Sequence, residues 1–329
     1  MSADNIWNNA LSRSVAGTEF TSRIGTAYEE ISFQSHGDPT RPFVFNPVRN
    51  ASPIYAAAEM LWYMLGSGDG EMICHYAPSY SRFLNNGIAM GAYGPRIFQS
   101  AAWEDIANEL FRGETRRAVI PIYGLDDLRN TRAGLDIQDI PCTLSLQFLN
   151  RNGELHMITN MRSNDVWLGL PYDCFCFMMI QLMMCEITGL KPGKYWHQAG
   201  SMHIYEKNMD LFSKMSGLDS SYIDKLAREV TDEETEPLMI SYSYDTPTLQ
   251  LIPALRKEEQ LVRNGAYMES EGILAKKYRD FSISTTLLTL ASCQNYHQIT
   301  DKDIQRLSQF VDSSLIIRAA EIVNRREHK

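Results

Sequence analysis

The chain has 329 residues and a mass of 37.5 kDa, with 44% apolar and 22% charged residues. This composition is typical of a folded globular protein and excludes a disordered chain. With 31 basic and 40 acidic residues, the formal charge is −9. A net-acidic chain repels phosphate on average, which argues against general binding of nucleic acid or an anionic membrane surface. A local group of arginines can still bind one phosphate.

The N-terminal residues 1–9 have neither the basic nor the apolar part of a secretory signal, so we expect a cytoplasmic protein. The longest apolar run, 174–187, is shorter than the roughly 20 residues that span a bilayer, and it predicts a buried core helix. We expect the six cysteines to be free thiols. Cys174 and Cys176 could form one pair of metal ligands, but the sequence has no second pair at the spacing of a zinc site, so we expect no bound metal.

The predicted elements begin, in chain order, with a loop at 22–26 and a buried helix at 51–65, whose only charge is Glu59. An amphipathic helix at 103–111 and a short strand at 118–123 follow. Residues 144–149 and 155–161 flank Asn152-Gly153, which is a strong hairpin signal. The remaining predictions are a helix at 173–188 ending at Gly189, a strand at 238–244, and a helix at 304–325.

One block carries most of the candidate chemistry. It consists of Ile140-Pro141-Cys142-Thr143 and of residues 160–173, NMRSNDVWLGLPYD. Across the hairpin, Arg162 is a permanent cation that favours a thiolate at Cys142. Taken alone, a lone cysteine is more simply a buried apolar residue. Asp173, at the start of an apolar helix, is more simply an N-cap.

The whole block resembles the thymidylate synthase family, in which a Pro-Cys strand is followed at this spacing by Arg-Ser-x-Asp-x-x-Leu-Gly-x-Pro-[Phe/Tyr]-Asn. Further segments match in the same order between about residues 20 and 210: Arg23-Ile24-Gly25-Thr26, Glu59-Met60-Leu61-Trp62, Tyr93-Gly94, Arg116-Arg117 and Gly200-Ser201-Met202-His203-Ile204-Tyr205. The resemblance implies an α+β fold, a large mixed β-sheet flanked by helices. We expect residues 1–210 to form this catalytic core. We expect residues 211–329 to form a divergent, mainly helical extension that lies on the same domain.

The resemblance also implies roles. Cys142 would attack C6 of a pyrimidine, and the catalytic set would be completed by Glu59, Tyr93 and Asp173. The nucleotide phosphate would be bound by Arg23, Arg162 and Ser163, with Arg116 and Arg117 reaching it from the other subunit of a homodimer. The sugar would be bound by His203 and Tyr205. The co-substrate, 5,10-methylenetetrahydrofolate, would lie against Tyr80, Phe83, Asp165, Leu168 and Gly169.

Asp173 replaces the family's asparagine. A carboxyl group accepts from the exocyclic amine of cytosine, whereas an amide suits uracil. Among relatives, aspartate here marks cytidylate hydroxymethylases, including those of nucleoside antibiotic biosynthesis. Tyr80 stands near a position where the synthase has tryptophan, and a more polar wall is compatible with admitting water.

The leading interpretation is therefore 5-hydroxymethylation of CMP or dCMP by methylenetetrahydrofolate and water, through a covalent Cys142 adduct. One alternative is C5-methylation, by a dCMP methylase or a dUMP thymidylate synthase. Another is a non-catalytic relative that binds a nucleotide or RNA, although the acidic charge and a complete set of phosphate arginines argue against it.

Overall fold

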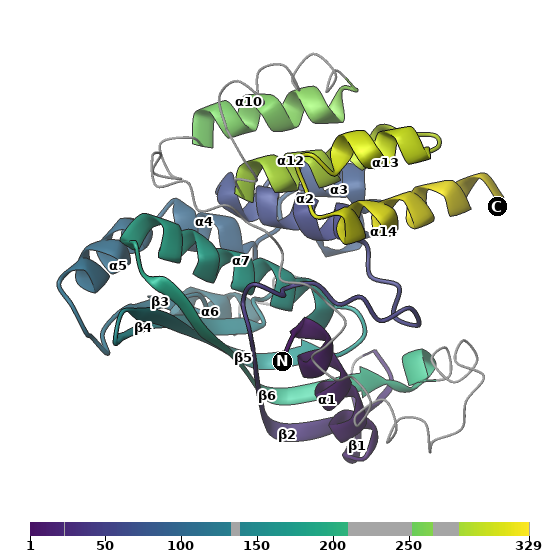
Figure 1. Ribbon diagram of the computed structural model, residues 1–329. Helices are drawn as coiled ribbons and strands as arrows, with labels where there is room; N and C mark the ends of the chain where they lie inside the picture. The colour runs from purple at the N-terminus through teal and green to yellow at the C-terminus, as the bar shows by residue number, and fades with distance from the viewer. Residues whose placement is uncertain (23, 133–138, 210–251, 266–282, 329) are drawn as a thin grey trace.

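The computed structural model describes residues 1–22, 24–132, 139–209, 252–265 and 283–328 (Figure 1). A six-stranded sheet has the order β1-β2-β6-β5-β4-β3. All neighbouring strands are antiparallel except β5 and β6, which are parallel. The strands are β1 (Thr18–Thr21), β2 (Thr26–Gly37), β3 (Val119–Pro121), β4 (Thr143–Arg151), β5 (Glu154–Asp165) and β6 (Lys191–Tyr205). The expected α+β fold with a large mixed sheet is confirmed.

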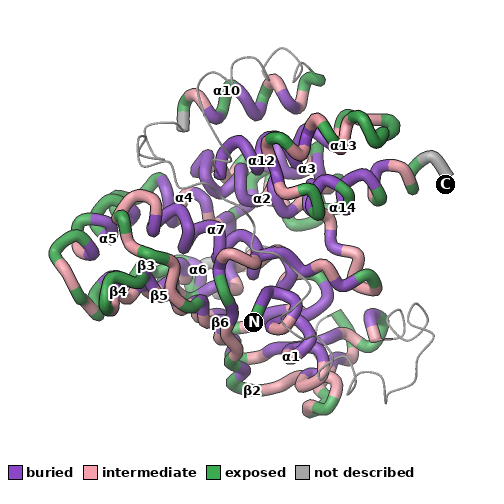
Figure 2. The backbone as a smooth tube through the Cα atoms, viewed as in Figure 1, coloured by how far each residue is buried: buried purple, intermediate pink, exposed green. Residues whose placement is uncertain are grey.

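Helix α7 (Leu170–Thr188) connects the parallel strands β5 and β6, because parallel neighbours need a long crossover. Together with α1 (Ala3–Val15) and α5 (Ala102–Phe111), α7 covers one face of the sheet. The next layer holds α2 (Pro53–Met64), which contacts α7 and α4 (Tyr93–Phe98). Beside α2 lie α3 (Gly70–Tyr76) and the 3-10 helix η1 (Pro78–Phe83). Figure 2 shows α2 and α7 buried along most of their lengths.

The described C-terminal helices gather on the side of α2 and α3 that faces away from the sheet (Figure 1). They are α10 (Ile252–Arg263), α12 (Ile283–Ser292), α13 (Asp301–Leu307) and α14 (Ser313–Asn324). The prediction of a single helix over 304–325 is therefore wrong, because the helix is interrupted between α13 and α14. There Asp312 caps a new helix by accepting from the Ser314 backbone amide.

Several local predictions are confirmed. The hairpin turn has both residues in the left-handed region, Asn152 at φ 53° and Gly153 at φ 79°, as a two-residue hairpin loop requires. Helix α7 ends at Gly189, which is also left-handed. Because α7 is long and apolar enough to cross a membrane by length and composition, its burial matters: 78% of that stretch lies inside the fold, as a core helix should. The loop residue Arg23 and the strand predicted at 238–244 lie outside the described residues.

Candidate active site

A cavity of about 140 Å³ lies between α2, η1, α4, the segment before β4, and the start of α7. Four residues predicted as catalytic and one predicted to bind folate line it together: Glu59, Tyr93, Cys142, Asp173 and Tyr80. They come from five separate stretches of the chain, so only the fold brings them to one place. The cavity is therefore the candidate active site.

Cys142 lies immediately before β4, where the backbone amide of Arg162 donates to the Cys142 carbonyl at 2.8 Å. The register between β4 and β5 shifts just beyond it, between Thr143 and Ser145. Such bulges redirect side chains beside functional sites. The Arg162 Nη2 lies 3.7 Å from the Cys142 sulfur, and its Nε donates to the Pro141 carbonyl at 2.9 Å. The predicted cysteine–arginine contact across the hairpin is present.

The pKa of the Cys142 thiol is raised, chiefly because burial disfavours the thiolate. Arg162 acts in the opposite direction, and the nearby carboxylates of Asp173 and Asp139 add to the rise. Arg162 alone therefore does not outweigh burial in the ligand-free site, contrary to the simplest expectation from its charge.

Two of the predicted residues, Glu59 and Asp173, present carboxyl groups to the same cavity. Burial raises the pKa of Glu59 to about 8, with a further contribution from the charge of Asp173. Burial also raises the pKa of Asp173 to about 7. Glu59 accepts from the Tyr55 hydroxyl at 3.0 Å and is 3.8 Å from the Cys176 sulfur. Groups that hold or release a proton near neutral pH are suited to general acid–base chemistry.

Asp173 is not the N-cap of its helix. Helix α7 begins at Leu170 with Gly169 as its N-cap residue, so Asp173 lies in the first turn. Its Oδ2 instead accepts from the Asn164 side-chain amide at 2.7 Å. The apolar helix extends three residues further toward the N-terminus than predicted, because Pro171 is well tolerated in the first turn. Asp173 is thereby placed inside the cavity wall.

Aromatic rings form part of the cavity wall. Tyr93 stacks on Phe177, with ring centroids 5.9 Å apart, and its hydroxyl accepts from the Thr143 backbone amide at 3.3 Å. Tyr80 packs edge-to-face on Trp62 at 5.6 Å and on Phe83 at 5.5 Å. Phe83 itself does not line the cavity and is 38% exposed. The rings therefore offer a flat apolar wall beside the cysteine.

The predicted sugar, phosphate and folate residues on β5 and β6 are close neighbours. The strands pair Ser163 with Ser201 and Asp165 with His203, and the Ser163 hydroxyl lies 3.4 Å from His203 Nδ1. Asp165 accepts from the backbone amides of Trp167 and Leu168, which shapes the turn into α7 at Gly169. Leu168 is exposed, and the ring of Tyr205 packs against that of His203 at 5.2 Å.

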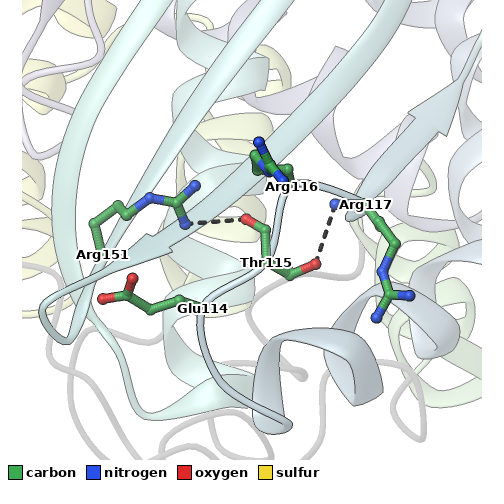
Figure 3. Close-up of a pocket in the computed structure, with 5 residues that line it drawn as sticks. All are labelled: Glu114, Thr115, Arg116, Arg117 and Arg151. Carbon is green, nitrogen blue, oxygen red and sulfur yellow. Dashed lines mark hydrogen bonds between the residues drawn. The ribbon is translucent and has the colours of Figure 1, made fainter.

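Arg116 and Arg117 do not line this cavity. They belong to a separate pocket of about 480 Å³, which Glu114, Thr115 and Arg151 also line (Figure 3). Arg151 donates to the Thr115 carbonyl at 3.0 Å, and Arg117 pairs with Glu109 at 2.8 Å. Arg116 and Arg117 are both exposed, and they line this separate pocket and not the cavity that holds Cys142.

The sequence interpretation missed two polar residues of the site. Asp139 lines the cavity and accepts from the Gly91 backbone amide at 2.9 Å. A Cβ on Gly91 would lie 2.9 Å from the Asp139 backbone carbonyl oxygen, so a side chain at this position would require the backbone to shift. Asn164, 3% exposed, binds Asp173. Asn164 occupies the unspecified position of the Arg-Ser-x-Asp motif, which is the one signal that could have drawn attention to it.

No group of three or more histidine, cysteine, aspartate or glutamate side chains that could hold a metal ion occurs among the described residues. All six cysteines are free. The cavity brings together the Cys142 thiol, the carboxyl groups of Glu59, Asp139 and Asp173, and tyrosine hydroxyls, and the Arg162 guanidinium lies beside the thiol.

Fold and site together define an α+β protein built around a candidate nucleophilic cysteine. Residues 99–235 match the family model described as thymidylate synthase, a region that includes Cys142, Arg162 and Asp173. By this match the chain is similar to the thymidylate synthase family over residues 99–235, and members of that family carry out folate-dependent one-carbon transfer to C5 of a pyrimidine. Glu59 and Tyr93 lie N-terminal to the matched region, so their assignment depends on the local sequence resemblance and on the geometry of the cavity.

Relatives of two activities are similar to this chain. A deoxyuridylate hydroxymethyltransferase of Bacillus phage SP01 is 31% identical over 186 residues, covering 51% of this chain and 47% of the relative. A thymidylate synthase of Symbiobacterium thermophilum is 28% identical over 193 residues, covering 52% and 62%. A thymidylate synthase of Bacillus subtilis subsp. natto is 31% identical over 97 residues, covering 29% and 32%. The chain thus spans roughly a third to three fifths of the length of these relatives.

Proposed function

We propose that the protein is a folate-dependent 5-hydroxymethylase of a cytidine monophosphate, CMP or dCMP. The observation that carries the proposal is the cavity in which Cys142, Glu59 and Asp173 meet. The thiol supplies a nucleophile, and the two carboxyls have pKa values raised toward neutrality. Similarity to a hydroxymethyltransferase as well as to thymidylate synthases supports this reaction class.

In the proposed reaction, the Cys142 sulfur attacks C6, and the electron pair of the C5–C6 double bond makes C5 a nucleophile. C5 takes up the one-carbon unit of methylenetetrahydrofolate and loses its proton, and tetrahydrofolate leaves an exocyclic methylene on C5. Water adds to that methylene, C5–C6 re-forms as a double bond, and the thiolate departs. Glu59, whose pKa burial raises to about 8, would hold and return protons at the ring.

The folate would lie against the rings of Tyr80 and Trp62, whose edge-to-face packing leaves an aromatic wall on the cavity. Asp165 and Leu168, at the turn into α7, would lie beside the pterin. Ser163 and Arg162 would contact the phosphate, and His203 with Tyr205 the sugar. The carboxyl of Asp173 would accept from the exocyclic amine of cytosine.

A specific observation favours a second candidate, hydroxymethylation of a uridine nucleotide: one similar protein acts on deoxyuridylate. Hydride transfer in place of water addition would instead give a methyl product, as in the thymidylate synthases.

The test is to mix purified protein with CMP, dCMP, UMP or dUMP and methylenetetrahydrofolate, and to determine the masses of the products by mass spectrometry. We expect a hydroxymethyl product on a cytidine nucleotide. A methyl product, or turnover of uridine nucleotides alone, would contradict the proposal.

We propose further that the protein is a homodimer with shared phosphate sites. On β5, Leu155 and Met157 are buried under helices, while His156 and Ile158 on the opposite face are only half-buried. A second copy of the sheet would cover that face. Location in the cytoplasm and a place in nucleoside antibiotic biosynthesis stay predictions from the sequence.

Subunit mixing tests the shared site. In a homodimer in which Arg117 crosses to its partner, the Arg117→Ala and Cys142→Ala proteins are each inactive. A mixed dimer then holds one intact site, so equal mixing should restore about a quarter of the wild-type activity. The measurement is turnover after subunit exchange verified by native mass spectrometry. Verified exchange without recovery would show that the arginines act within their own subunit or not at all.

A further inference from the structure

Behind Asp173 runs a chain of buried polar side chains that reaches from α7 into the sheet. Asn164 Nδ2 donates to Asp173 Oδ2 at 2.7 Å, and Asn164 Oδ1 lies 3.0 Å from His197 Nε2. His197 Nδ1 lies 2.8 Å from the Tyr195 hydroxyl. Tyr195 and His197 are two residues apart on β6, so they share one face, and both are fully buried.

The donor and acceptor of each contact follow from chemistry. Burial lowers the pKa of His197 to about 3, so the ring is neutral and carries a single N–H. An ionised Asp173 oxygen only accepts, so the Asn164 amide nitrogen faces it and the amide oxygen faces His197. His197 Nε2 therefore donates to Asn164, and its Nδ1 accepts from the Tyr195 hydroxyl.

Gly169 makes room for this contact. A Cβ at this position would lie 3.0 Å from both Asn164 Nδ2 and Asp173 Oδ2, which is tighter than most real contacts. The helix start is thus shaped so that Asn164 reaches the carboxyl from β5. A purely structural hydrogen bond from Asn164 to the carboxyl would not need the buried polar groups of His197 and Tyr195 behind it. Each buried polar group is costly to desolvate.

We propose that Asn164 and His197 are positioning residues that determine base specificity through Asp173. Asn164 donates to Oδ2 and keeps that oxygen an acceptor, while His197 holds the Asn164 amide in this orientation. Oδ1 is then the atom that takes or gives a proton at the base. A carboxyl held in one orientation reads one donor–acceptor pattern, whereas a rotating carboxyl adapts to either base. This inference rests on the proposed function, because it assumes that Asp173 faces a pyrimidine ring.

The first test removes the amide. Asn164→Ala is compared with Gln181→Ala, which deletes an equally buried amide on the same helix as Asp173; that amide donates to the Leu155 carbonyl at 2.8 Å and does not line the cavity. For each protein, Kd and kcat/KM are measured for CMP, dCMP, UMP and dUMP. In Asn164→Ala we expect the cytidine-to-uridine ratio to fall at least about tenfold, because the carboxyl is no longer oriented. In Gln181→Ala it should stay within about twofold.

The second test addresses His197. His197→Gln retains an N–H donor for Asn164 Oδ1, and His197→Leu does not. We expect the ratio to stay near wild type in the first variant and to fall in the second. Since Kd is measured without folate, this readout does not depend on turnover, and the pair of variants separates lost orientation from lost packing.

The outcomes separate the inference from the proposed function. If Asn164→Ala weakens all nucleotides equally, or changes the ratio no more than Gln181→Ala does, the positioning role is overturned whatever the substrate. If the wild-type protein prefers uridine nucleotides, the cytosine assignment is overturned. The positioning role then still stands provided that Asn164→Ala, and not Gln181→Ala, shifts the ratio.

Discussion

Replacing Cys142 by serine is expected to lower kcat/KM by at least about 10³, because a serine hydroxyl is almost never ionised near neutral pH and is a far weaker nucleophile. Arg162, 3.7 Å from the sulfur, assists a thiolate but cannot make an alkoxide accessible. The measurement is steady-state turnover, together with mass spectrometry of the intact protein to detect a covalent nucleotide adduct.

Cys74→Ser is the matched control, since Cys74 is partly exposed on α3 and does not line the cavity. We expect this variant to keep near-native turnover. Near-native activity in Cys142→Ala would contradict the proposed covalent mechanism.

Asp173→Asn is expected to reverse base preference, lowering kcat/KM for the cytidine nucleotide and raising that for the uridine nucleotide. A neutral amide can donate to the O4 of uracil, which a carboxylate cannot, and unpaired buried groups can discriminate by roughly 10⁴. The amide oxygen can still accept from Asn164, so we expect the folded structure to persist. The quantity to measure is the ratio of the two kcat/KM values, alongside the midpoint of thermal unfolding.

An unchanged ratio in Asp173→Asn, with the unfolding midpoint preserved, would mean that another group reads the base. The uridylate and methylating alternatives would then become the better interpretations.

The sequence predicted those parts of the fold whose signals are local. The Asn152-Gly153 turn, the apolar helix α2 and the glycine stop of α7 each depend on residues a few positions apart. Helix α1 was missed because its apolar residues are interrupted by asparagines and serines, and it is stabilised by long-range contacts such as the bond from Trp7 Nε1 to the Val166 carbonyl. The break between α13 and α14 was missed because Asp312 can equally well occupy a helix surface.

The candidate site was predictable as far as the resemblance reached. Of the residues that it implied, Glu59, Tyr80, Tyr93, Cys142 and Asp173 line the cavity, and the structure brings these together from stretches far apart in the chain. Asp139 and Asn164 could not be found in that way, since their importance arises from contacts with Gly91 and Asp173 across the fold. The helix start at Asp173 was misjudged because Asp is equally favourable as an N-cap and in a first turn.

The position of α2 has a consequence for any attempt to shorten the protein. This helix carries Glu59, and it lies between α7 on one side and α12 on the other, with Arg256 of α10 donating to the Leu65 carbonyl at its end. Nearly every residue of α2 is buried, so this helix has no polar face suited to contact with solvent. Deleting the C-terminal helices would uncover an apolar surface on the helix that carries Glu59. We therefore expect a truncated chain to lose solubility and to disturb the cavity that Glu59 lines.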